Sequence, residues 1–229
     1  MRRKTTHAVA APQESRHVVT RPPHVGFVAA LRGVQRAGSV ASLSVLLLLT
    51  ALVMLVAMRY PVDVRRALSI YLILPVGAGL LPTLVWPRLA PAWQLMRIEH
   101  PRVVTALLVW MCGVVAFVVA FGALTGGFGV AGTVIALLTT SALALFALAI
   151  TARFGVAWTL AATLAWTVLS VTIAGDVLAG SWLWVLAVPA WAETATSPLR
   201  VGAALVGGVV LVTGAWVGAR RSLVGRRVG

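Results

Sequence analysis

Residues 103–150 read VVTALLVWMCGVVAFVVAFGALTGGFGVAGTVIALLTTSALALFALAI and contain no charged residue and no histidine. A helix that crosses the hydrocarbon core of a bilayer needs about 20 apolar residues. The stretch holds two such helices, at 103–123 and 129–150, with a short gap between them. It therefore predicts a pair of membrane-spanning helices.

The rest of the chain has the same character. Of its 229 residues 60% are hydrophobic and only 10% are charged, and the mean hydropathy is +0.99. Ordinary soluble domains carry about 25% charged residues, and the few charges here lie in short runs between long apolar stretches. We therefore expect an all-α, polytopic membrane protein with six transmembrane helices, the other four at 41–58, 67–86, 156–175 and 201–219.

A further apolar segment, SWLWVLAVPAWA at 181–192, precedes the last span. As a helix its 12 residues would reach only about 18 Å, whereas the hydrocarbon core is about 30 Å thick. Indole rings favour the headgroup level of a bilayer. The residues Trp182, Trp184, Pro189 and Trp191 therefore predict a short re-entrant outer hairpin, although an aromatic belt at the end of a loop would have the same pattern.

The basic residues determine the expected orientation. Lys and Arg near span ends resist translocation, and with both termini inside, 15 of the 19 basic residues lie on the cytoplasmic side. The outer exceptions are Arg59, Arg65, Arg66 and Arg200. The net charge of +14 is thus explained by membrane orientation and not by nucleic-acid binding, because the basic residues flank spans and form no face with interleaved aromatics. We expect a bacterial cytoplasmic (inner) membrane protein.

Four regions follow from this layout. Residues 1–24 are polar and contain prolines, which predicts a disordered cytoplasmic tail. Residues 25–38 have apolar and basic sides, typical of an amphipathic interfacial helix, although an extension of the first span fits equally well. Residues 39–219 form the six-span domain, and 220–229 form a basic cytoplasmic tail. No cleaved signal peptide is expected, since a long polar leader precedes the first apolar run.

The inventory of reactive side chains is small. The only lysine is Lys4, so no Lys-containing phosphate loop exists, and the only cysteine is Cys112, which excludes an internal disulfide and a cysteine-based zinc site. No Asp, Glu, His, Lys or Arg lies within the six spans, which counts against proton-coupled carriers and voltage sensors. We therefore expect no catalytic residue, no metal site and no cofactor in this chain.

Hydroxyl groups recur in the fifth span. Spacings of 4, 4 and 3 place four of them on one helical face. That face should point at protein or water and not at lipid. It either lines a substrate path or bonds to its own helix and packs against a neighbour; the residues are Thr159, Thr163, Thr167 and Ser170.

The longest inner loop, PRLAPAWQLMRIEHPR at 87–102, holds about two helical turns between prolines. In this short helix Trp93, Leu95 and Met96 can face lipid or a partner. Such a helix can dock into a cytoplasmic protein, but a solvated loop with an interfacial tryptophan would have the same sequence.

The order of these parts resembles the permease subunits of type-2 ABC transporters, a family of many bacterial exporters. The resemblance covers the helix at 25–38, the spans, the loop at 87–102, the element at 181–192 and the basic end. It implies pairing with a second copy or a related permease, and export of a hydrophobic or amphipathic substrate. It also implies a separate ATP-binding subunit that carries ATP and Mg and contacts Trp93, Gln94, Arg97 and Glu99.

Two other functions remain open. The chain is alternatively a non-catalytic membrane scaffold or assembly subunit, since hydroxyl and glycine packing fits both. A third possibility is an integral membrane enzyme acting on lipid, for which Arg97, Glu99 and His100 are the only clustered polar group.

Overall fold

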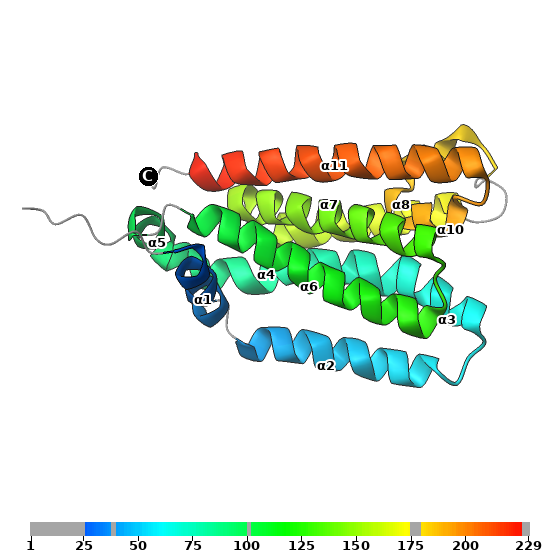
Figure 1. Ribbon diagram of the computed structural model, residues 1–229, viewed down its shortest axis with the longest axis horizontal. Helices are drawn as coiled ribbons and strands as arrows, with labels where there is room; N and C mark the ends of the chain where they lie inside the picture. Colours follow the sequence, from blue (N-terminus) through cyan, green and yellow to red (C-terminus); the bar gives the residue numbers. More distant parts are fainter. Residues whose placement is uncertain (1–25, 38–39, 100–101, 175–179, 226–229) are drawn as a thin grey trace, which may run out of the picture.

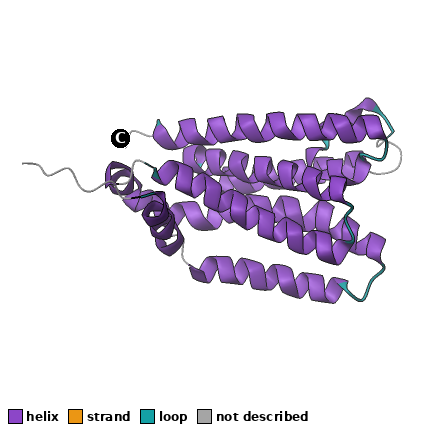
Figure 2. Cartoon of the chain, viewed as in Figure 1, coloured by secondary structure: helices purple, strands orange, loops and turns teal. Residues whose placement is uncertain are grey.

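A computed structural model describes residues 26–37, 40–99, 102–174 and 180–225. All regular structure in these ranges is helical (Figure 2), which confirms the all-α prediction. The tail predicted at 1–24 lies outside the described residues, as does the end of the basic tail. The main helices are α1 (Phe27–Ala37), α2 (Val40–Ala57), α3 (Val62–Leu68), α4 (Leu74–Leu89), α5 (Trp93–Glu99), α6 (Val103–Gly126), α7 (Val130–Phe154), α8 (Val156–Ala174), α10 (Trp191–Thr194) and α11 (Pro198–Val224).

The long helices lie side by side in an elongated bundle (Figure 1). In the described residues, five helical stretches are long and apolar enough to cross a membrane: 62–98, 103–126, 130–154, 156–174 and 198–224. Helix α2, which is 18 residues long and predominantly apolar, runs beside them. A helix therefore lies at each of the six predicted spans. The number of membrane crossings is six if α2 crosses and five if it does not.

Two short helices lie across one end of the bundle. Helices α1 and α5 and the last turn of α11 form what we call the α1/α5 end, and α3 and α10 mark the opposite, α3/α10 end (Figure 1). In α1, Ala30 and Val34 are fully buried, whereas Arg32 and Arg36 are exposed. This two-sided pattern packs α1 onto α6 and leaves its charges outside.

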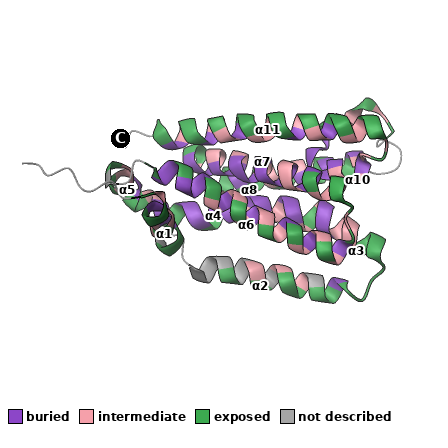
Figure 3. Cartoon of the chain, in the orientation of Figure 1, coloured by how far each residue is buried: buried purple, intermediate pink, exposed green. Residues whose placement is uncertain are grey.

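Helix α7 is the centre of the bundle, since α4, α6, α8, α10 and α11 all contact it. Its buried positions are mostly small or branched apolar residues, and Figure 3 shows that few of its surfaces are exposed. Small residues allow membrane helices to approach closely, which gains dispersion energy where no hydrophobic effect operates. The bundle is thus held by close packing around α7.

Helix α4 follows a distorted first turn. Ser69–Ile73 form a π-helical turn, and Pro75, Pro82 and Pro87 follow in α4. Proline removes a backbone donor, and such breaks are tolerated at membrane depth when hydroxyls and neighbouring helices satisfy the backbone. Here Ser69 Oγ donates to the Arg65 carbonyl at 2.7 Å, so the helix continues without interruption from α3.

Helices α4 and α8 touch at a glycine. A Cβ atom built at Gly79 would lie 2.8 Å from the Thr163 Cβ, which is too close for two carbon atoms, whereas a Cβ at Gly77 would meet nothing. Only a residue without a side chain fits at position 79 unless α8 moves away.

Replacing Gly79 with alanine should therefore lower the thermal unfolding midpoint of the detergent-solubilised protein. Overpacking of this kind costs about 1–3 kcal/mol. Gly77→Ala is the matched control and should leave the midpoint unchanged or raise it, because alanine is the better helix former. Equal midpoints for the two variants would show that α4 and α8 are not in contact here.

Candidate functional site

Helix α5 is fastened to the end of α11. The Trp93 Nε1 atom donates to the Leu223 carbonyl at 3.2 Å, and Arg97 Nη1 donates to the Val224 carbonyl at 2.6 Å. Carbonyls in the last turn of a helix lack intrahelical donors, and a cation there interacts favourably with the helix dipole. We call these two hydrogen bonds the α5–α11 clasp.

The clasp corrects the expectation that Trp93 faces lipid or a partner. Trp93 is only 2% exposed and packs edge-on against Trp86, with ring centroids 5.3 Å apart. A buried indole N–H needs an acceptor, and its acceptor lies 130 positions further along the chain, which sequence inspection could not reveal. Gln94 is half-buried, and the side chain of Glu99, like all of His100, lies outside what the structure describes.

The exposed surface of α5 is apolar. Leu95 is 60% exposed and Ile98 is 76% exposed, three positions apart on one helical face. Ile98 was missed in the sequence, although its spacing from Leu95 was a usable signal. Two large apolar side chains therefore project from a helix that the clasp holds in place.

The hydroxyl face of α8 points into the bundle. Thr159, Thr167 and Ser170 are buried, and Thr163 is half-buried. The Thr159 and Thr151 hydroxyls lie 2.8 Å apart, and Thr167 Oγ1 donates to the Thr163 carbonyl at 2.8 Å. In this conformation Thr159 and Thr167 bond to α7 or to their own helix, whereas the buried Ser170 hydroxyl has no hydrogen-bond partner among the described residues.

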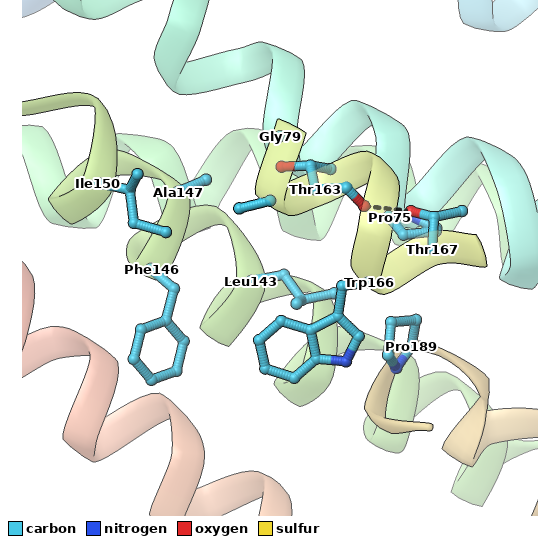
Figure 4. Close-up of a pocket in the computed structure, with 11 residues that line it drawn as sticks. Pro75, Gly79, Leu143, Phe146, Ala147, Ile150, Thr163, Trp166, Thr167 and Pro189 are labelled. Carbon is cyan, nitrogen blue, oxygen red and sulfur yellow. Dashed lines mark hydrogen bonds between the residues drawn. The ribbon is translucent and has the colours of Figure 1, made fainter. Parts of the chain in front are cut away.

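A small cavity lies beside this face (Figure 4). It has a volume of about 40 Å³ and is lined by Thr163 and Thr167 of α8, by Gly79 of α4, and by Trp166 and Pro189. A water needs roughly 10–15 Å³, whereas a site for a small molecule takes about 300–1,000 Å³. The cavity therefore has room for water and not for a substrate.

The segment predicted at 181–192 folds into short turns at the α3/α10 end. It comprises 3₁₀ turns at Trp182–Leu186 and Val188–Ala190, followed by α10. Trp191 is buried and donates through Nε1 to the Trp184 carbonyl at 3.0 Å, while Trp182 is 74% exposed. The segment does not cross the bundle, as its length predicted.

Charged side chains secure this end. Arg66 Nε lies 2.6 Å from Glu193 Oε2 and so joins α3 to α10. The Arg200 guanidinium lies over the Trp184 ring, 5.4 Å from its centroid, a favourable cation–π geometry. Arg65 Nη1 also donates to Met58 Sδ at 2.9 Å, so three of the four arginines expected outside have side-chain partners.

Nothing in the described ranges forms a metal centre, since no group of three or more His, Cys, Asp or Glu side chains comes together there.

Comparison of the chain with protein-family models, curated proteins and solved structures finds no match. Function must therefore be argued from the α5–α11 clasp, the exposed face of α5 and the arrangement of the helices.

Breaking the α5–α11 clasp should destabilise the bundle. Trp93→Phe leaves the buried Leu223 carbonyl without a donor, which costs about 1–3 kcal/mol. Arg97→Gln should cost less, because this hydrogen bond is exposed to solvent. Thermal unfolding in detergent measures both effects, with Arg102→Gln as a control that removes an exposed arginine outside the clasp. Wild-type behaviour of Trp93→Phe would refute the clasp.

The Arg66–Glu193 pair should show charge-swap behaviour. Arg66→Glu and Glu193→Arg should each lower the unfolding midpoint, and the double exchange should restore most of the loss. The effect should stay at or below about 1 kcal/mol, because the side chains are 35% and 32% exposed and solvent screens the pair. Additive losses in the double variant would mean that the two groups do not interact.

Proposed function

We propose that this chain is the membrane-spanning permease subunit of an ABC-type exporter, driven by ATP hydrolysis on a separate subunit. The order of parts supports this: interfacial helix α1, a crossing by α2, a second by α4, helix α5, three crossings by α6 to α8, a folded-back segment and a last crossing by α11. The proposal counts α2 as the first of six spans.

The observation that carries the proposal is the attachment of α5. This helix connects α4 to α6 through the chain and is bonded to α11 by the clasp. A force applied to α5 would therefore reach three crossings at once. A partner that moves during its own reaction could drive the bundle through such an element, because packed helices switch between discrete arrangements.

The exposed face of α5 suits such a partner. Leu95 and Ile98 project away from the bundle, and apolar anchors entering a groove are a common mode of helix recognition. We propose that the ATP-binding subunit takes up these two side chains, with Gln94, Arg97 and Glu99 at the edge of the contact.

The distribution of arginines supports an orientation with the α1/α5 end in the cytoplasm of a bacterial inner membrane. Cytoplasmic ends carry an excess of Lys and Arg. Among the described residues, Arg32, Arg36, Arg88, Arg97, Arg102, Arg153, Arg220 and Arg221 lie toward the α1/α5 end, and Arg59, Arg65, Arg66 and Arg200 toward the other. The proposal therefore places both termini inside.

The substrate path is proposed to lie between two permease subunits. Within one chain the cavity beside Thr163 and Thr167 is too small for a substrate, whereas α8 presents a broad apolar face outward. That face includes Trp158, Leu164 and Val168, which are 68%, 63% and 57% exposed. A hydrophobic or amphipathic substrate would suit a path with such walls.

A membrane scaffold is the second candidate, and the closed interior favours it. A scaffold needs no path, and Thr159 and Thr167 on the hydroxyl face of α8 are engaged in hydrogen bonds within the bundle. The structure adds no support for an enzyme acting on lipid, because Arg97 of its candidate polar cluster donates to the Val224 carbonyl. The two leading candidates differ in whether an ATPase binds α5.

Affinity purification from native membranes in mild detergent tests the proposal. A P-loop ATPase should co-purify in stoichiometric amount, and Ile98→Glu should reduce its recovery at least about tenfold, as burying an unpaired charge at an interface would. Val28→Glu, an equally apolar and exposed position on α1, is the control and should retain the ATPase.

Recovery of other membrane proteins but no ATPase would favour the scaffold. Retention of the ATPase by Ile98→Glu would remove α5 from the contact.

A further inference from the structure

A second hollow of the bundle lies at the α1/α5 end, between α7 and α11. Its volume is about 480 Å³, and its apolar wall includes Phe146, Ile150 and Phe154 of α7. Arg153, in the last turn of α7, and Arg221, in the last turn of α11, line the same groove. Two helices distant in the sequence thus bring two guanidinium groups to one apolar groove.

These two guanidinium groups have no partner within the described ranges. Both side chains are exposed and neither contacts a carboxylate or a hydrogen-bond acceptor there, in contrast to Arg97 in the clasp. The acidic side chains that the structure describes, Asp63 and Glu193, belong to α3 and α10 at the opposite end (Figure 1). The helix dipoles favour cations here, but they leave the five N–H donors of each arginine available.

Apolar side chains continue along α7 from the groove toward the middle of the helix. Phe146 and Ile150 line both this groove and the cavity of Figure 4, so the apolar wall continues along α7 away from the helix end. A ligand that fills the site must therefore combine an anionic group at Arg153 and Arg221 with an apolar tail along α7. A free anion would use only the first of these features.

We propose that the groove between α7 and α11 is a binding site for an anionic phospholipid of the leaflet at the α1/α5 end. Arginine binds phosphate through paired N–H donors, and basic pockets between membrane helices are suited to anionic headgroups. The acyl chains lie against Phe146 and Ile150. This site is independent of the proposed transport function, because it requires only that the bundle lie in a membrane.

Native mass spectrometry of the full-length protein in detergent tests the site. Dioleoylphosphatidylglycerol should bind more tightly than dioleoylphosphatidylcholine, and Arg153→Gln with Arg221→Gln should abolish most of the preference. At about fivefold in affinity for each arginine, the double variant should bind phosphatidylglycerol about 25-fold more weakly.

The matched control is Arg220→Gln, which removes an exposed arginine from the same turn of α11 but outside the groove. It should change the affinity by about twofold or less, since it retains both phosphate contacts. An equal loss in the control, or wild-type affinity in the double variant, would overturn the proposal.

The apolar half of the groove is tested separately with Gly218→Phe. Gly218 lines the groove, and a Cβ atom there meets nothing within 4 Å, so the added ring fills the groove without displacing the helices. Binding of phosphatidylglycerol should be lost while both arginines remain. Gly202→Phe, at an equally open position of α11 outside the groove, should bind normally.

Normal binding by Gly218→Phe would mean that the arginines attract anions at the surface only. Glycerol 1-phosphate binding as tightly as phosphatidylglycerol would identify a free phosphate ester as the ligand and would likewise contradict the lipid site.

Discussion

The absence of water at membrane depth is the constraint on which the rest of this structure depends. A backbone in hydrocarbon must pair its own polar groups, which only helices and closed barrels achieve. Many side-chain hydroxyls follow this rule as well: Thr139, Thr151 and Thr213 all donate to carbonyls four residues earlier. The irregular turns at 181–194 lie at an end of the bundle, where water and headgroups are available.

The same constraint places the charged side chains at the ends of the helices. The middle of the bundle offers hydroxyls, small residues, an apolar outer surface and a cavity of about 40 Å³, whereas the charged groups lie at the ends. At the α1/α5 end the clasp fixes α5, and Arg153 and Arg221 line an apolar groove. At the other end Arg66, Glu193 and Arg200 secure the turns. We therefore place the proposed ATPase contact at an end of the bundle, on α5.

Local features of the sequence predicted most of the fold, and long-range contacts account for what was missed. Apolar length located the helices and showed that 181–192 cannot cross, and the spacing of Thr159 to Ser170 correctly predicted a face turned toward protein. Whether that face packs or lines a path depends on how closely Gly79 brings α4 to α8, and periodicity carries no such information. The position at which α11 ends likewise determines that Trp93 is buried and that Arg153 and Arg221 line the same groove.

Photo-crosslinking from position 98 tests the central claim most directly. With a photoreactive phenylalanine in place of Ile98, ultraviolet irradiation of native membranes should join this chain to a P-loop ATPase, identified by mass spectrometry. The same probe at Val28, which is 59% exposed at the same end on α1, reports background capture of neighbouring proteins. Capture of an ATPase at position 98 above that background is the predicted result. Reaction at 98 with lipid alone, or with the same proteins as at 28, would contradict the proposal.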